Sequence, residues 1–360
     1  MMSIAHVGLD VHKEQTRVVL LPQHGTEPLD ECTLPTTAKH LCRYMRRWGE
    51  RFQLRCYYEA GPLGYVPHRW LTGMGVTCEV IAPSKTPRAP GDRVKTDRRD
   101  ARVLARQGRA GTLVRVWVPT PQEEQVRGVV RHRETVVRDV VAAKQRLLKF
   151  VSLRGMVYPS KGSTWTRAHM QWLRGLCFEG ADAWTAEQLL GDLQYRQHRL
   201  AEADRQVAEL AQSDRYGQAV GRVCCFRGLD VVSAMVVVTE TVDFGRFGEA
   251  GQYMSYWGLT CREDSSGPTR RRGSITKCGS SRARRVWVEA AWHYRHKPAV
   301  GENLRRRQQG QPAEVIAHAW KAQVRLHKKF WRISMCKNTQ TAAVAVAREL
   351  AGFVWGAMQL

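Results

Sequence analysis

The sequence lacks the features that place a protein in a membrane or in a disulfide framework. It has no apolar run long enough to span a bilayer, and no charged segment leads into an apolar one as in a signal peptide. Its 10 cysteines include no C-x-x-C pair, so neither a zinc ribbon nor a disulfide framework is indicated. We therefore expect no membrane partner and a chain that works in a reducing cytoplasm.

Acidic residues are also scarce. The 360 residues contain 33 Asp and Glu against 57 Lys and Arg, which gives a formal net charge of +24. Such an excess indicates a polyanionic partner, and nucleic acid is favoured over a membrane surface. Several of the 12 tryptophans, such as Trp165 and Trp331, lie near basic residues. That pattern suits stacking on unpaired bases, although core packing explains most tryptophans equally well.

The first third of the chain predicts strands followed by alternating strands and helices. Two apolar runs, residues 4–10 and 16–22, are separated by a short polar segment, which predicts an antiparallel pair. The further segments are expected to be strands at 29–35, 54–60 and 76–83 and helices at 36–50, 65–75 and 97–111. This order predicts a mixed α/β domain over residues 1–115.

The remainder is expected to be mainly helical and contains no internal repeat or low-complexity tract. Residues 116–216 hold two long amphipathic segments, which predict an antiparallel coiled hairpin that dimerises or carries nucleic acid. Residues 217–360 form a third region. It begins with a glycine-containing turn and an apolar helix, resembling a helix-hairpin-helix, and continues through a Gly-Ser-Arg-rich loop to a packed terminal helix.

Four carboxylates stand out against this basic background. Asp10 ends the first strand, Glu59 lies near the end of the fourth, and Asp97 and Asp100 share one face of a helix. Adjacent first and fourth strands, with that helix packed across them, would bring all four together. Such a group repels itself unless a cation neutralises it, and Mg²⁺, as one ion or two, prefers oxygen ligands. Mn²⁺ is the expected substitute.

Each carboxylate also has a simpler explanation. Acidic residues in the first turn of a helix stabilise its dipole, which alone accounts for Asp97 and Asp100. Asp10 could be a turn residue and Glu59 could pair with a lysine. The four as a set, in this order of elements, favour a metal site.

Three stretches, VGLDVHK, YYEAG and VKTDRRDARVLAR, resemble the DEDD transposases of the IS-one-ten group of insertion sequences, relatives of the Piv invertases. A later stretch, YWGLTCREDSSGPTRRRGSITKCGSSRARR, resembles the second characteristic block of that family. The residues that match this block are Gly258, Leu259, Ser266, Gly267, Gly273, Ile275, Thr276, Lys277, Gly279 and Arg284. Cys261 and Ala283 depart from the family pattern without removing a chemical group.

The resemblance implies a RuvC-like (RNase H-fold) N-terminal domain with Asp10, Glu59, Asp97 and Asp100 as its metal-binding catalytic tetrad. It also implies a C-terminal transposase domain in which Ser266 is the nucleophile, with the adjacent Ser265 as its nearest rival. A serine oxygen needs activation by a base, a metal or a positive field. The residues expected to contact nucleic acid are Lys95, Arg98, Arg99, Arg270, Arg271, Arg272, Lys277 and Arg284.

The resemblance further implies a site-specific recombinase that forms a phosphoserine link to DNA. Donor and target DNA would be selected by a bridge (seeker) RNA encoded by the element, and the protein would act as an oligomer. The hairpin suggests a dimer and the family a tetramer on the synaptic complex. Three alternatives stay open: a RuvC-like Holliday-junction nuclease, a Piv-like DNA invertase and a non-catalytic nucleic-acid-binding protein.

Overall fold

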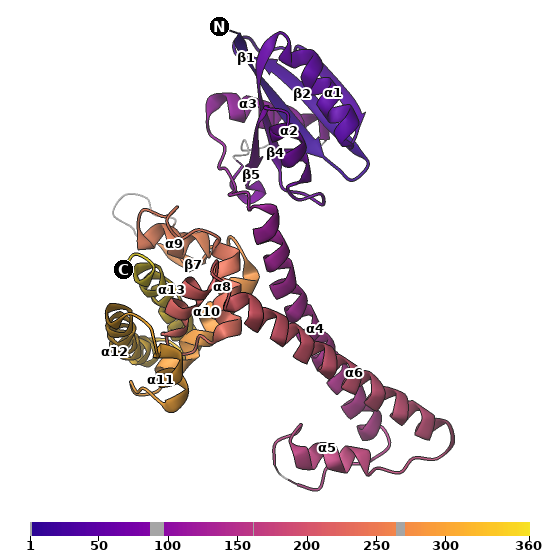
Figure 1. Ribbon diagram of the computed structural model, residues 1–360, viewed down its shortest axis with the longest axis vertical. Helices are drawn as coiled ribbons and strands as arrows, with labels where there is room; N and C mark the ends of the chain where they lie inside the picture. The colour runs from indigo at the N-terminus through magenta and orange to yellow at the C-terminus, as the bar shows by residue number, and fades with distance from the viewer. Residues whose placement is uncertain (1, 87–96, 161, 264–270) are drawn as a thin grey trace. The chain divides into compact units, whose positions relative to one another are not determined.

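A computed structural model of the chain describes residues 2–86, 97–160, 162–263 and 271–360 (Figure 1). The chain divides into two compact units, Met1–Pro119 and Thr120–Leu360. The first is a mixed α/β unit and the second is mostly helical, as the sequence predicts. None of the helices in the described ranges combines the length and the apolar character needed to cross a bilayer.

A five-stranded sheet of order β3-β2-β1-β4-β5 forms the centre of the first unit. The two strands next to β1 differ in direction: β2 is antiparallel to it and β4 is parallel. The predicted antiparallel pair and the predicted contact of the first and fourth strands are both confirmed. The strands are β1 (Ser3–Val11), β2 (Gln15–Pro22), β3 (Asp30–Pro35), β4 (Phe52–Glu59) and β5 (Thr77–Ile81).

Helices cover both faces of this sheet, because apolar residues occupy successive positions along its central strands. In β2, Val18 and Leu20 pack with the α1 and α2 side, whereas Val19 and Leu21 pack against α3. Successive side chains of a strand point to opposite faces, so a run of buried residues requires a cover on each side. The helices are α1 (Ala38–Gly49), α2 (Val66–Thr72) and α3 (Asp97–Ala110), with a short 3₁₀ turn at Pro83–Lys85.

Two long helices of the second unit, α4 (Pro121–Ser152) and α6 (Gly180–Ala211), run side by side in opposite directions (Figure 1). Ion pairs fix this direction: Arg133 Nε lies 2.7 Å from Asp204 Oδ1, and Arg146 Nη2 lies 3.0 Å from Asp192 Oδ2. Residues of increasing number along α4 therefore pair with residues of decreasing number along α6. A short helix, α5 (Arg167–Arg174), stands between them in the chain.

The apolar core of the rest of this unit is built around its last helix. The predicted terminal helix is confirmed as α13, which packs against α9, α10 and α12. Trp257 and Trp287 are fully buried in the same core. The elements are α7 (Gly217–Cys224), α8 (Val231–Thr241), α9 (Ala250–Tyr256), β6 (Cys261–Glu263), β7 (Arg272–Ile275), α10 (Ser281–Trp292), the 3₁₀ turn His293–Arg295, α11 (Glu302–Gln308), α12 (Ala313–Cys336) and α13 (Thr339–Ala357).

Candidate active site

The register of β1 and β4 places two of the predicted carboxylates side by side. Gly8 pairs with Tyr57 and Leu9 with Tyr58, so Asp10 and Glu59 follow as the next pair at the carboxyl end of both strands. Asp10 shares its face with Gly8, and Glu59 shares its face with Tyr57, because side chains alternate along a strand. Tyr57 packs with α3, so both carboxylates belong to the face of the sheet that α3 covers.

A glycine allows α3 to reach that face. A Cβ atom on Gly8 would lie 1.9 Å from the carbonyl oxygen of Ala101, so no other residue fits this contact without moving the helix. Further along, Gly108 of α3 lies against the ring of Tyr57. Since Arg109 reaches the carbonyl of Pro22 near the far end of the sheet, α3 runs antiparallel to β1. Its first turn therefore lies toward the end of β1 that carries Asp10.

The two carboxylates also have polar neighbours. His12 Nε2 lies 3.2 Å from Asp10 Oδ2, and the Thr86 hydroxyl donates to Glu59 Oε1 over 2.8 Å. Neither partner is among the residues predicted from the sequence. His12 could have been found because it follows Asp10 by two residues, just after β1, but nothing in the turn after β5 marked Thr86. These contacts orient the two carboxylate side chains at the carboxyl ends of β1 and β4.

The remaining members of the tetrad are placed in part. Asp97 and Asp100 both belong to the first turn of α3, and the side chain of Asp100 is half-buried. Of the predicted phosphate-binding residues, Arg99 is exposed on the same turn. Lys95 lies outside the described residues, and the side chains of Asp97 and Arg98 are likewise not described. Among the described side chains, no three metal-ligating groups converge closely enough to hold an ion.

The side chains at the carboxyl ends of β1 and β4 are of a type that binds a hard divalent cation. Asp10, Glu59 and Asp100 all offer carboxylate oxygens, and no described cysteine lies among them. Carboxylate oxygens match Mg²⁺ and Mn²⁺, whereas the nitrogen of His12, beside Asp10, is a donor type that Zn²⁺ and copper also accept. The residues thus fit the predicted metal in kind.

The described part of the second characteristic block contains two short strands, β6 and β7. The sequence predicted only a loop here, whereas β6 and β7 pair antiparallel. Strands of three and four residues are too short to show an alternating pattern, so this pairing had no sequence signal. Several predicted residues of the block lie outside the described ranges: Ser265, Ser266, Gly267 and Arg270.

Two glycines and one lysine shape the described part of this loop. Gly258 and Gly279 have φ values of 63° and 70°, and Lys277 has a φ of 57°. The Lys277 amide donates to the Gly258 carbonyl over 3.1 Å, and Thr276 donates to Thr260 over 2.9 Å. Lys277 is exposed, as is Arg271, while the side chain of Arg272 is not described. Both exposed cations are thus available to a phosphate.

Arg284 reaches into this loop rather than away from it. Its Nη1 donates to the carbonyl oxygens of Cys278 (2.8 Å) and Trp257 (3.1 Å). Burial lowers the pKa of its guanidinium from the ordinary value. Arg284 therefore joins the two sides of the loop, and its predicted contact with nucleic acid stays a prediction.

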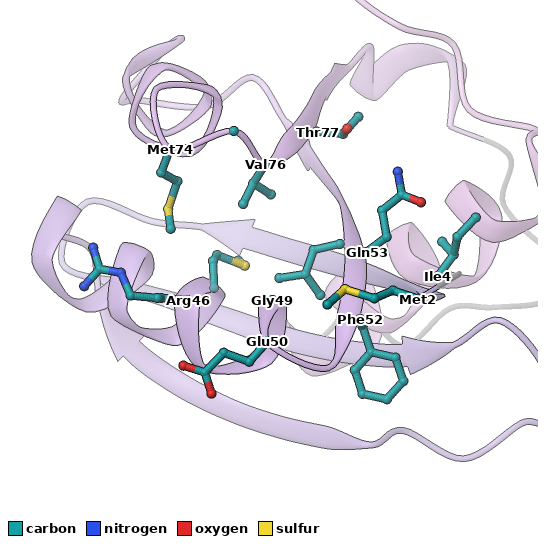
Figure 2. A pocket seen from close by; sticks show the side chains of 13 residues that line it. Met2, Ile4, Arg46, Gly49, Glu50, Phe52, Gln53, Met74, Val76 and Thr77 are labelled. Atoms are coloured by element: carbon teal, nitrogen blue, oxygen red, sulfur yellow. The ribbon is translucent and has the colours of Figure 1, made fainter.

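A hollow in the first unit lies away from the carboxylates. This cavity has a volume of about 760 Å³. Figure 2 shows Met2, Met74 and Val76 among the residues that line it. Phe52 and Thr77 begin β4 and β5, so this cavity opens at the end of the sheet opposite to Asp10 and Glu59. Its lining is mainly apolar, and it offers no carboxylate cluster. The cavity is therefore not part of the candidate active site.

Comparison with known proteins supports the resemblance of both characteristic blocks to the transposase family. A transposase family model for the DEDD enzymes of IS110 matches residues 7–154, which include β1, β4 and α3. A second model, described as the transposase IS116/IS110/IS902 family, matches residues 222–305.

Three relatives extend this similarity over most of the chain. The protein y4qE of Sinorhizobium fredii, which bears the name of a transposase, is 39% identical over 83% of this chain and 73% of its own. The transposase for insertion sequence element IS1533 of Leptospira borgpetersenii is 33% identical over 90% of this chain and 95% of its own. A protein of Pseudomonas aeruginosa named as a family 20 transposase is 24% identical over 81% of this chain and 84% of its own.

The chain belongs to the IS110 family of transposases. As an IS110 transposase, it has an insertion-sequence element as its biological context. The α/β unit carries the DEDD block of the family, and the helical unit carries the second transposase block.

Proposed function

We propose that this IS110 transposase cleaves and rejoins DNA strands to excise and insert its element, with Ser266 as the nucleophile. The observation that carries the proposal is the placement of Asp10 and Glu59 as neighbours on the α3 face of the sheet. The first turn of α3, with Asp97 and Asp100, lies toward the same end. A net charge of +24 supports a nucleic-acid substrate.

In the proposed reaction, Ser266 Oγ attacks a DNA phosphorus. The Oγ–P bond forms as Oγ gives up its proton, the P–O bond to the leaving sugar breaks, and that sugar oxygen takes up a proton. Rejoining reverses these steps when a strand hydroxyl attacks the phosphoserine and the serine hydroxyl leaves. Arg271 and Lys277, exposed beside the loop, would offset charge on the phosphate, as would Arg270 and Arg272.

Asp10, Glu59, Asp97 and Asp100 would hold Mg²⁺, as one ion or two, with Mn²⁺ as a substitute. When bound, the metal would supply positive charge against the scissile phosphate. His12 and Thr86 would keep the carboxylates of Asp10 and Glu59 oriented before the metal arrives. The RuvC-like (RNase H-fold) assignment of this unit is part of the same proposal.

The proposed partners are nucleic acids and further copies of this chain. We propose donor and target DNA as substrates, a bridge RNA of the element as the guide, and a homo-oligomer that forms a tetramer on the synaptic complex. The hairpin of α4 and α6 would act as a coiled dimerisation arm. The turn between α7 and α8 would act as a helix-hairpin-helix. There Asp230 caps the start of α8 by accepting the Ser233 amide over 2.8 Å.

The decisive test is to trap protein–DNA covalent product with a substrate that carries the ends of the element. We expect an adduct on the wild type and on Ser265→Ala, and none on Ser266→Ala. An adduct that survives Ser266→Ala would refute the assignment of the nucleophile. Cleavage without any adduct would favour the Holliday-junction nuclease, and inversion products would favour the Piv-like reaction.

The guide RNA has a separate test. We expect a discrete RNA species from the element to co-purify with the full chain and to be identified by sequencing. If no discrete RNA co-purifies, the guide is refuted while the strand chemistry of Ser266 stands.

A further inference from the structure

A groove between α12 and α13 combines positive charge with an exposed aromatic ring. It has a volume of about 840 Å³ and lies in the second unit, on elements that the second family model, at residues 222–305, does not reach. We call it the α12–α13 groove. The residues that the argument uses are Trp320, Lys321, Lys328, Lys329, Arg332 and Glu349.

The spacing of its cations comes from helix geometry. Lys321, Lys328 and Arg332 recur at intervals of seven and four residues along α12, so they follow one face of the helix. All three are exposed. With a rise of about 1.5 Å per residue, the row from Lys321 to Arg332 spans roughly 16 Å. That length corresponds to a few phosphates of an extended strand.

One carboxylate sits in the groove and is already neutralised. Glu349 of α13 accepts from Lys329 Nζ over 2.5 Å and also from Arg325. Burial acts to raise the pKa of Glu349, but the hydrogen bonds from Lys329 and Arg325 outweigh it and hold the pKa below the ordinary value. No ion pair with a carboxylate of the described residues involves Lys321, Lys328 or Arg332. The groove therefore keeps an excess of positive charge.

An indole ring stands at the start of this row. Trp320 is 42% exposed, although it is large and apolar, and it is adjacent to Lys321. Phe353 and Val324 provide apolar surface within the groove. Aromatic rings beside a cationic track are the combination that binds single strands, since bases stack on the rings and phosphates follow the charges. In a duplex the base faces are already stacked on each other, so Trp320 would gain no partner there.

We propose that the α12–α13 groove binds an unpaired stretch of nucleic acid, with one base stacked on Trp320 and its phosphates along Lys321, Lys328 and Arg332. The groove shares no residue with the candidate active site or with the basic residues predicted around Ser266. Binding at the groove needs no strand cleavage. A failure of the proposed recombinase reaction would therefore leave binding at the groove unaffected.

The test measures binding of labelled probes to the full chain by fluorescence anisotropy. The probes are oligo(dT) and oligo(rU) of about 20 nucleotides, which form no stable secondary structure, and a duplex of the same length. We expect Trp320→Ala to weaken single-strand binding about 5- to 100-fold and to leave duplex binding nearly unchanged. Trp320→Phe should recover most of the affinity because it keeps a ring. The single-stranded probe that loses more affinity identifies the preferred sugar.

The matched control is Trp184→Ala, which removes another exposed tryptophan, on α6, outside the groove. We expect it to bind all probes as the wild type does. Lys328→Ala should lower the salt dependence of single-strand binding, with a slope that falls by about 0.7. Unchanged single-strand affinity in Trp320→Ala would overturn the proposal, as would an equal loss for single strand and duplex. Photo-crosslinking of a 4-thiouridine probe gives an independent check, because a lack of crosslinks to α12 and α13 would also overturn it.

Discussion

Two regions of the chain, the carboxylate end of β1 and β4 and the described part of the second block, are held in place by different forces. In the first unit, Asp10 and Glu59 take their positions from strand register and from the close packing of α3 on Gly8. In the second, the loop that leads to Ser266 takes its shape from backbone hydrogen bonds and from Arg284. The energy of close packing rises sharply when atoms are forced together, whereas water partly replaces a hydrogen bond that is lost. Substitutions in the sheet should therefore have larger effects than substitutions in the second block.

The largest effect is expected from Gly8→Ala. The new methyl group would overlap the Ala101 carbonyl, push α3 away from β1 and shift Asp100 away from Asp10. We expect a loss of about 1–3 kcal/mol in the free energy of unfolding, measured by urea denaturation, together with a loss of strand cleavage. Gly49→Ala is the control, because a Cβ there meets nothing within 4 Å. Equal stability of Gly8→Ala and the wild type would show that α3 is not in close contact with β1.

A smaller effect is expected from Arg284→Lys. Lysine cannot reproduce the paired donation to Trp257 and Cys278, so the loop loses one or both bonds at a cost of about 1–2 kcal/mol. Hydrogen exchange at the amides of Thr276 and Lys277 should become faster, and strand cleavage should fall. Arg305→Lys serves as the control, since Arg305 is exposed and pairs with Glu302 on the same helix. Unchanged exchange in Arg284→Lys would mean that the loop is held without this arginine.

The smallest effect concerns a buried histidine of α5, outside both of these regions. His169 accepts from the Trp165 amide over 3.2 Å and packs against the rings of Tyr158 and Trp172. Burial lowers its pKa below the ordinary 6.5. The unfolded state therefore binds the proton more readily, so the stabilising contribution is complete above pH 6.5 and is lost as the pH falls below it.

Hydrogen exchange of the α5 amides measures this local stability. In the wild type, we expect protection to decrease between pH 7.5 and pH 5, after correction for intrinsic exchange, by at most about 1.4 kcal/mol per pH unit. His169→Phe should be less stable at neutral pH but should show a flatter pH profile. A wild-type profile that is equally flat would contradict a buried neutral imidazole.

Much of the first unit could be predicted from the sequence because its signals are local. Apolar runs such as residues 16–22 and the glycine-marked turn after Glu59 fix the strands, and the pairing of the first and fourth strands follows from their order. The close contact of Gly8 with Ala101 could not be predicted, because it depends on how a distant helix packs. The same holds for the bond from Thr86 to Glu59.

The second unit shows the opposite balance. Its long helices were predicted from amphipathic spacing, and the terminal helix from its apolar composition. The β6–β7 hairpin was missed because its strands are too short for any periodicity. The role of Arg284 within the loop was missed as well, since an arginine in a basic stretch gives no sign of whether it donates inward or outward.

The central claim is that acidic side chains from β1, β4 and α3 share one divalent metal site. Electron paramagnetic resonance of Mn²⁺ titrated into the full chain tests it most directly, because the free ion gives a signal that binding removes. We expect the wild type to bind Mn²⁺, Asp10→Asn and Glu59→Gln each to lose that binding, and Glu27→Gln, an exposed control in the same unit, to retain it. Equal Mn²⁺ binding by the wild type and both site variants would contradict the account.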